Sequence, residues 1–370
     1  MKHFLKKQAP SAPMAAAAMR GVSLIELMIG MVLGLVVVLV VTQVLSFSEG
    51  QRRTTTGGAD AQVNGALAVY SLQREIQMAG YGLTTDPGAL GCDVHATHAT
   101  AGNFVWTLAP VVITDGANGA PDTVAVMSAS RSFSVPMTMT VDRGLAGDKF
   151  VVNSALGVMP GDLLIAVPSG YVNANNWCSA FAVDGVLNTN QLMSNGASGW
   201  NQALAAVLPG AGYPAGTRLL NTGALVNRSF SVSAALSLQQ QTRSSTSGAA
   251  TVEELFPQIV NMQAMYGKDT NADGVVDAYD NVTPTTNAGW RQVLTVRLAL
   301  VARSATFQKE EVTQAQPQWD VGAAVPVAGA AACGTSRCIT LKVDGLDDWK
   351  HYRYSIYAVV IPLRNMLWGS

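Results

Sequence analysis

The feature that most constrains this chain is a long apolar run close to its N-terminus. Residues 27–41 are all apolar or glycine, and Leu24 and Ile25 extend the run toward the roughly 20 residues that cross a bilayer as a helix. Residues 1–20 carry no acidic side chain and four basic ones, namely Lys2, Lys6, Lys7 and Arg20. Because positive charge stays on the cytoplasmic side, we expect one membrane helix with its N-terminus inside and the remaining chain outside.

One ionisable side chain interrupts this run. Glu26 lies one helical turn inside the segment, where a carboxylate costs roughly 2 to 3 kcal/mol on insertion scales. A charge kept at that cost indicates a function and requires a partner. An ordinary secretory signal does not explain the segment, because its small-residue cleavage site follows the apolar region, whereas Arg20 and Gly21 precede it.

The residues around Glu26 resemble a known processing signal. The string Arg20-Gly21-Val22-Ser23-Leu24-Ile25-Glu26-Leu27-Met28 is similar to the class III signal of type IV pilins and pseudopilins. The resemblance implies that a prepilin peptidase cuts after Gly21 and that Val22 becomes the first mature residue, which is methylated in this family. Family members usually begin with Phe, whereas this chain has Val22. Glu26 is then the fifth residue, the position of the family's glutamate.

This processing supplies the partner that Glu26 requires. In a stack of parallel helices, the new α-amino group of Val22 in one subunit meets the Glu26 carboxylate of its neighbour, so both charges leave the lipid together. We therefore expect Glu26 to act in filament assembly. Gly30 and Gly34 have G-x-x-x-G spacing, which fits either close contact with a neighbouring helix or the ordinary tolerance of glycine in membrane helices.

Beyond the apolar run, the pattern predicts an α+β fold. A helical stripe of spacing three and four ends before Gly80, so residues 22–80 are expected to form one long helix; the stripe is Ala66, Val69, Leu72, Ile76 and Ala79. Residues 81–250 read as a variable β-rich head, with strands expected over 123–127, 133–141, 163–167 and 226–238. Spacing on one apolar face predicts a second helix over residues 251–266, and alternation predicts strands over 290–303 and 352–363.

The C-terminal region resembles a family of minor pilins. The residues concerned are Met262-Gln263, Tyr266-Gly267, Trp290, Val296-Arg297 and Leu363-Arg364-Asn365, together with Arg74 and Ala79-Gly80-Tyr81 near the end of the long helix. These resemble the PilW type of minor pilin. The resemblance implies a type IV pilin-like fold, in which the long helix packs on an antiparallel sheet. The expected organisation is a leader (1–21), the helix (22–80), the variable head (81–250) and a PilW-like region (251–370).

The four cysteines are expected to form disulfides, since most of the chain is predicted to lie outside the cytoplasm. Three pairings are possible. We favour Cys333 with Cys338, which closes a short loop, and Cys92 with Cys178 as the second pair. A zinc site at Cys92, His95 and His98 is the alternative, but it lacks an obvious fourth ligand.

A twelve-residue segment matches a calcium loop. Oxygen-bearing side chains stand at loop positions one, three, five, nine and twelve, and Val275 offers its backbone carbonyl at position seven; the side chains are Asp269, Asn271, Asp273, Asp277 and Asp280. Gly274 occupies position six, where the loop turns sharply. Position twelve is Asp rather than Glu, and residues 281–284 do not read as a helix. We therefore expect a structural Ca²⁺ site outside an EF-hand.

Composition and motifs exclude several functions. The formal net charge is −1 and no basic face is evident, which gives no basis for binding nucleic acid. No grouping of Ser, His and Asp stands out, so we do not expect an enzyme. The resemblance instead implies a minor pilin that resides in the bacterial inner membrane and helps to prime pilus assembly, with minor pilins, the major pilin, prepilin peptidase and possible tip adhesins as partners. The alternatives are a minor pseudopilin of a type II secretion system and a pilin-anchored adhesin.

Overall fold

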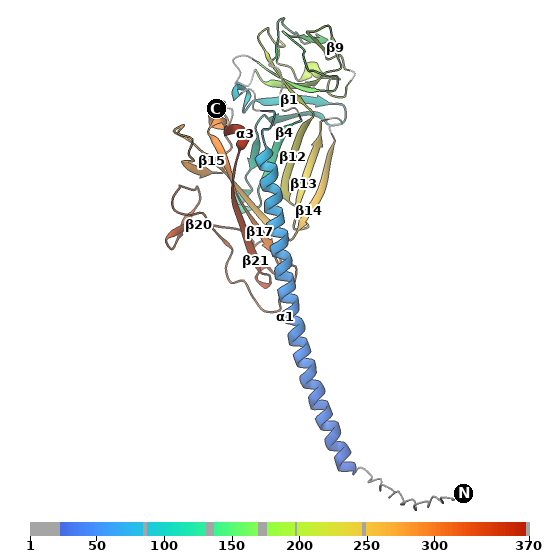
Figure 1. Cartoon of the computed structure of the whole chain (residues 1–370), viewed down its shortest axis with the longest axis vertical. Coiled ribbons are helices and arrows are strands. Elements are labelled where there is room, and N and C mark those ends of the chain that lie inside the picture. Colours follow the sequence, from blue (N-terminus) through green and yellow to red (C-terminus); the bar gives the residue numbers. More distant parts are fainter. Residues whose placement is uncertain are drawn as a thin grey trace, which may run out of the picture. The chain divides into compact units, whose positions relative to one another are not determined.

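The computed structural model describes residues 23–83, 87–130, 137–168, 176–196, 198–245 and 249–367. The expected processing residues Gly21 and Val22 lie outside these ranges. The chain forms two compact units, Met1–Thr55 and Thr56–Ser370. Helix α1 (Leu24–Met78) contributes its first part to one unit and the remainder to the other (Figure 1). The N-terminal apolar helix and the antiparallel sheets described below confirm the α+β class.

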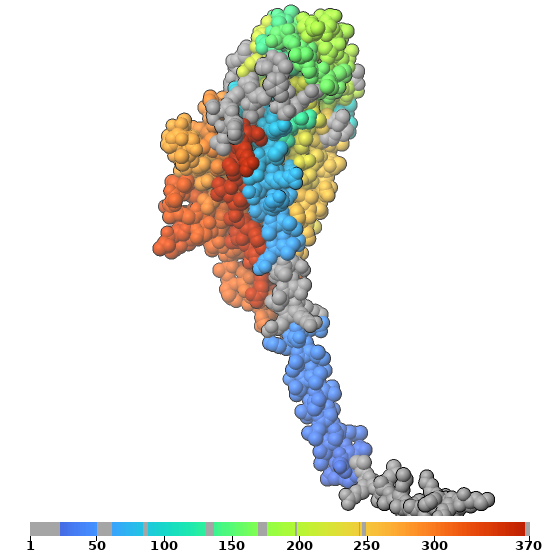
Figure 2. All heavy atoms as spheres, in the orientation of Figure 1, coloured from blue at the N-terminus to red at the C-terminus, as the bar shows by residue number. Residues whose placement is uncertain are grey.

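In the second unit, α1 packs on the sheets through one narrow face. Its buried residues are spaced by three and four, as an amphipathic helix requires; they are Ala61, Gly65, Ala68, Leu72, Ile76 and Ala79. The predicted stripe was wrong at Ala66, which is exposed, whereas the half-buried Val69 packs against the same core as Leu72. Gly65 allows the close approach, since a Cβ there would collide with the ring of Tyr357. Strand β21 (Tyr354–Pro362), which contains Tyr357, lies alongside this part of the helix (Figure 2).

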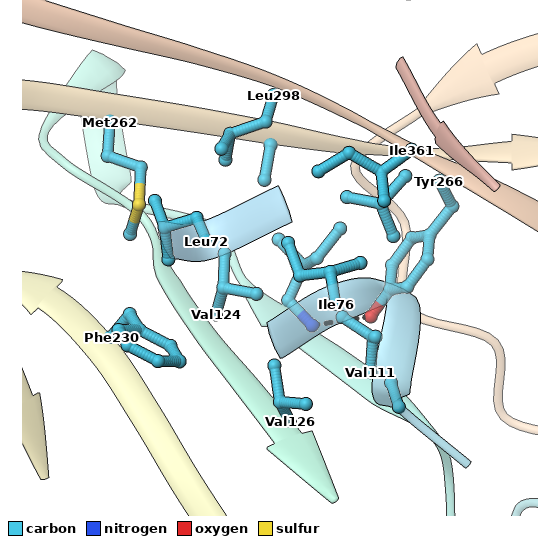
Figure 3. Packing of buried hydrophobic residues seen from close by; sticks show 14 of the residues in the cluster. Leu72, Ile76, Val111, Val124, Val126, Phe230, Met262, Tyr266, Leu298 and Ile361 are labelled. Carbon is cyan, nitrogen blue, oxygen red and sulfur yellow. Dashed lines mark hydrogen bonds between the residues drawn. The ribbon is translucent and has the colours of Figure 1, made fainter. Parts of the chain in front are cut away.

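Two antiparallel sheets cover this helix face. The order of the five-stranded sheet is β14 (Ala250–Pro257), β13 (Ser237–Ser244), β12 (Leu225–Val232), β4 (Thr123–Ala129) and β3 (Val111–Thr114). The order of the four-stranded sheet is β16 (Ala278–Asp280), β15 (Ile259–Lys268), β17 (Val293–Arg303) and β21 (Tyr354–Pro362). Both sheets contribute to one core around Leu72 and Ile76, where the Ile113 N–H donates to the Tyr266 hydroxyl at 2.6 Å (Figure 3).

The middle of the chain forms further sheets with cores of their own. A six-stranded sheet has the order β2 (Gly102–Thr107), β1 (Asp93–His98), β8 (Cys178–Ala182), β7 (Leu163–Val167), β11 (Arg218–Gly223) and β5 (Met137–Thr138). A three-stranded sheet in the same part of the chain consists of β6 (Lys149–Val151), β10 (Gln191–Met193) and β9 (Gly185–Leu187). A second three-stranded sheet lies in the C-terminal part and consists of β18 (Gln318–Asp320), β20 (Ser336–Thr340) and β19 (Ala331–Cys333). The short helices are η1 (Pro87–Ala89), η2 (Ala117–Gly119), η3 (Leu204–Ala206), η4 (Trp349–His351), α2 (Asn287–Arg291) and α3 (Arg364–Leu367).

Several expected elements differ from the structure. The helix predicted over residues 251–266 is wrong, because this segment forms β14 and β15, joined at Gln258 with a φ of +63°. A spacing of four, as between Met262 and Tyr266, also places two side chains on one face of a strand, so helix and strand share this signal. Residues 226–238 form β12, a turn and the start of β13 rather than one strand, and Trp290 lies in α2, before β17 begins.

A buried carboxyl group connects the two sheets that cover α1. Asp122, which is 1% exposed, accepts the N–H of Gly116 at 2.8 Å and the N–H of Ala264 at 2.7 Å. Its own N–H donates to the Met262 carbonyl. Burial raises the pKa of Asp122 to about 6, although the two backbone donors act in the opposite direction. Ionisation of this group is therefore less favourable in the folded chain than in the unfolded one.

Stability should consequently fall as the pH rises through about 6. The folded pKa lies above the ordinary value of 3.8, so the contribution of Asp122 is fully present below pH 4 and is lost above the folded pKa. A shift of this size corresponds to at most about 3 kcal/mol. Urea unfolding at pH 4.5 and pH 7.5 tests this, with Asp122→Asn as the comparison. If the variant keeps the full pH dependence of the natural chain, Asp122 is not its source.

Candidate functional site

The first candidate site is the start of α1, where a local cap involves Glu26. The backbone N–H of Glu26 donates to the Ser23 carbonyl at 3.0 Å and approaches the Ser23 hydroxyl at 3.4 Å. Glu26 is the acidic residue of the first turn, and its side chain is exposed. Ser followed three residues later by Glu is the capping-box spacing, a signal that the sequence reasoning missed at this helix. Glu26 therefore stands where a helix favours negative charge.

The helix that follows fits a membrane anchor. The segment Leu24–Glu49 has a mean hydropathy of 2.9 and is not buried within the structure. Its Thr42 hydroxyl donates to the carbonyls of Val38 and Leu39, so this polar group is satisfied inside the helix, as lipid requires. A Cβ added at Gly30 or Gly34 would meet no atom within 4 Å, so the described chain itself does not explain either glycine by packing.

A second apolar surface of α1 lies in the other unit, on the side away from the buried face. Four large apolar side chains are exposed there: Val63 (57%), Leu67 (48%), Tyr70 (66%) and Met78 (51%). We refer to these four residues as the outer stripe. Arg74 lies between Tyr70 and Met78, and the resulting spacing of four, three, four and four keeps all five residues on one side. This spacing of apolar residues is present in the sequence, but the sequence prediction did not include it.

The residues that carry the family resemblance gather near the end of α1. Trp290 is 1% exposed and meets Tyr266 edge to face, with ring centroids 5.8 Å apart. Leu363 is buried, and its N–H donates to the Leu294 carbonyl. The Asn365 amide donates to the Ala79 carbonyl at 2.8 Å and also approaches that of Met78 at 3.4 Å. The C-terminal motif therefore caps α1, where Gly80 turns the chain with a φ of +78°.

The candidate metal loop lies between β15 and β16 and is organised around Asp269. The Asp269 carboxylate accepts backbone N–H groups over the next turn of chain, from Asn271, Ala272, Asp273 and Gly274, at 2.7 to 3.3 Å. Gly274 has a φ of +84°, which explains why glycine occupies the sixth position. The backbone thus forms the tight turn that the sequence predicts.

The remaining candidate ligands separate into two groups. The Asn271 amide nitrogen lies 3.1 Å from an Asp273 oxygen and 3.4 Å from an Asp277 oxygen. Asp277 also accepts the N–H and the hydroxyl of Thr270, which lowers the pKa of its carboxyl group. Asp280 instead pairs with Lys268 at 2.6 Å. Within the described ranges, no three His, Cys, Asp or Glu side chains converge as a metal-binding group.

The Val275 N–H donates to an Asp273 oxygen at 2.8 Å, and the Val275 side chain is 62% exposed. Val275 therefore lies within the turn, at the loop position whose carbonyl the sequence predicts as a ligand. Oxygen atoms are the donors that Ca²⁺ prefers, and the chemistry of this donor set fits the ion. The structure brings Asn271, Asp273 and Asp277 together and turns Asp280 toward Lys268.

The cysteines form the two pairs favoured by the sequence, Cys92 with Cys178 and Cys333 with Cys338. The zinc alternative at Cys92 is consequently excluded, because its sulfur is bonded to another cysteine. The two histidines have other roles: His95 stacks on Trp177 with centroids 4.4 Å apart, and the buried His98 accepts the N–H of Thr100.

Comparison with known proteins adds one finding. Residues 225–365, from β12 to α3, match the family model of the type IV pilus-assembly protein W. The search of curated proteins and that of solved structures found no match. The matched region contains β15, β17 and β21 of the sheet beside α1, the acidic loop and the capping residue Asn365. Over residues 225–365 the chain therefore matches the PilW family, which implies a role in type IV pilus assembly, and the resemblance predicted from its sequence is confirmed.

Proposed function

We propose that this protein is a minor pilin that helps to prime type IV pilus assembly by packing with other minor pilins in the inner membrane and at the pilus tip. The observation that supports this most strongly is the PilW match in a chain that also has an exposed 26-residue apolar helix near its N-terminus. In this proposal, prepilin peptidase removes residues 1–21, and the head lies in the periplasm. The α1 helix and the sheets it packs on would form a type IV pilin-like fold.

The proposed mechanism is helix packing rather than catalysis. Glu26 would pair with the α-amino group of Val22 in a neighbouring subunit, which removes both charges from lipid. The outer stripe would then be covered by apolar helices of adjacent subunits. Burial of one large apolar side chain contributes about 1.5 to 3 kcal/mol, so its four residues suffice to influence assembly. The major pilin and a tip adhesin are further proposed partners.

Deletion of the gene, followed by a count of surface pili, tests the priming role. We expect few or no pili, with recovery when the natural chain is supplied. A normal pilus count would contradict priming. Normal pili combined with lost adhesion would favour the adhesin alternative, and a secretion defect without a pilus defect would favour a type II pseudopilin. The family match favours the pilus over both alternatives.

We also propose that residues 269–280 bind Ca²⁺ and that the ion serves a structural role. The proposed ligands are the side chains of Asp269, Asn271, Asp273 and Asp277 and the carbonyl of Val275, with Asp280 as a further ligand once it leaves Lys268. The Asn271 amide nitrogen, which lies between two carboxylates, supports the proposal because a cation there would satisfy the same charges. Rotation of the amide would then present its oxygen to the ion.

Calorimetry on the full chain should therefore detect Ca²⁺ binding at millimolar calcium or below. Asp277→Asn should weaken binding by about tenfold or more, because it removes one carboxylate from a site of hard oxygen ligands. Lys268→Met should strengthen binding, since it removes the cation that competes for Asp280. Asp344→Asn, an exposed substitution outside the loop, is the control. The absence of Ca²⁺ heat in the natural chain would contradict the assignment.

A further inference from the structure

A preformed apolar groove lies on the side of β15 opposite to α1. Its volume is about 370 Å³, and it is lined by Val260 of β15 and by residues of three other segments, namely 117–121, 232–236 without Ala235, and 342–346 without Asp344. Val260 belongs to a core cluster separate from the one that contains Leu72 and Ile76. The groove is therefore not the surface on which the helix packs, and the proposed pilin function does not use it.

The walls of this groove are fixed by a buried amide. Asn261 is 1% exposed, and its Nδ2 donates to the Lys342 carbonyl at 2.7 Å and to the Gly119 carbonyl at 3.2 Å. Gln263 donates to the Ala120 carbonyl at 2.7 Å. These bonds hold two of the lining segments to β15, so the groove exists before any ligand arrives.

Leu236 contributes to the groove at a conformational cost. It ends the turn between β12 and β13 with a φ of +58°, and its N–H donates to the Ser233 carbonyl at 3.0 Å. Glycine or asparagine suits such a left-handed position, whereas a branched side chain like leucine is an outlier there. Strained backbone positions of this kind cluster at functional sites, so a left-handed leucine that lines a cavity indicates a function for that cavity.

The chemistry of the lining defines the ligand class. Apart from Asn118, Ser233 and Lys342, the side chains around the groove are apolar or absent, and Lys342 is the charged residue of the lining. An apolar chain with one negative end satisfies both features. The volume is more than twice that of a cavity of roughly 150 Å³ that holds benzene, which leaves room for roughly ten to fifteen carbon atoms. The exposed neighbours Asp344 and Asp347 disfavour ligands with more than one negative charge.

We propose that this groove binds a free aliphatic monocarboxylate, with its chain against Val260, Leu236 and Leu346 and its carboxylate at Lys342. A polypeptide C-terminus offers the same two chemical features. It also brings backbone N–H and C=O groups, and the largely apolar lining offers these few hydrogen-bond partners. The single aliphatic chain is therefore the better fit, and the peptide becomes an outcome of the test.

The test uses the full chain in phosphatidylcholine nanodiscs and a decanoate probe with a diazirine at its apolar end. Mass spectrometry of the labelled peptides should place the label on residues 232–236 and 342–346. Excess decanoate should compete, and decanol should compete about tenfold less well because it lacks the charge-assisted contact. Label confined to Leu24–Glu49 would overturn the proposal, as would stronger competition by a peptide that ends in leucine.

Matched variants separate binding from folding. Lys342→Met should reduce labelling about tenfold by removing the cation, whereas Lys309→Met, an exposed lysine outside the groove, should not. Leu236→Gly should reduce labelling without loss of the fold, because glycine suits the turn. Asn188→Gly makes the same backbone change at another positive φ and should label normally. Unchanged labelling in both Lys342→Met and Leu236→Gly would overturn the site.

Discussion

Replacement of Glu26 by leucine should leave the protein in the membrane and exclude it from pili. The substitution removes a carboxylate from the apolar run, so insertion becomes more favourable by roughly 2 to 3 kcal/mol. The same change removes the proposed partner of the neighbouring α-amino group, which would then be left unpaired in lipid. Assembly should fail although insertion succeeds. Fractionation of membranes and immunodetection in sheared pili measure the two outcomes separately.

Two further variants identify the physical cause. Glu26→Gln keeps the size of the side chain and removes its charge, so it should assemble as poorly as Glu26→Leu. Thr42→Val changes a polar residue in the same helix whose hydroxyl is already satisfied by Val38 and Leu39, and it should assemble normally. Normal incorporation of Glu26→Gln would remove the basis for the proposed ion pair. N-terminal sequencing of the membrane form should begin at Val22, and a start at Met1 would exclude the processing that creates the partner amine.

Loss of the Cys92–Cys178 disulfide should destabilise the head strongly. The two cysteines are 86 residues apart and fully buried, and the bond lies in the core of the six-stranded sheet. Closure of a loop of this length restricts the unfolded chain and contributes about 4 to 5 kcal/mol in the chain-entropy account. Double replacement by alanine should lower the free energy of unfolding by about this amount, as measured by urea denaturation.

The second disulfide provides an internal control for this prediction. Cys333 and Cys338 are 5 residues apart in the sequence and only half-buried, so the same reasoning gives a contribution of about 2 kcal/mol. The corresponding double alanine variant should therefore unfold at a higher urea concentration than the Cys92 and Cys178 variant. The reverse order would show that loop length is not the dominant effect.

The sequence predicted best those features that depend on chain order alone. The apolar segment follows from uninterrupted composition, and the end of α1 follows from Gly80, whose φ of +78° a side chain would disfavour. Gly274 likewise marked the turn around Asp269, because its left-handed backbone is a local requirement. Such features need no knowledge of what lies across the molecule.

Other features depended on partners distant in the chain. The spacing of Met262 and Tyr266 predicts a helix over residues 251–266, but the two residues would share a face in a strand as well. Only the pairing of β15 with β17 decides between helix and strand. Asp280 is expected to be a ligand of the acidic loop, whereas the pairing of β15 with β16 brings it near Lys268. The buried face of α1 includes Gly65 rather than Ala66, because the ring of Tyr357 lies where a Cβ at Gly65 would be.

The cap formed by Asn365 has a consequence for the order in which the fold is completed. Residues that meet or cap the second part of α1 come from the C-terminal part of the chain, including Tyr357, Ile361 and Asn365. During synthesis the helix is made first, and these residues follow much later. Asn365 and the Ala79 carbonyl that it caps are 286 residues apart, so the end of α1 stays uncapped until this stretch has been made. A nascent chain that stalls before β21 cannot complete the contacts of its helix.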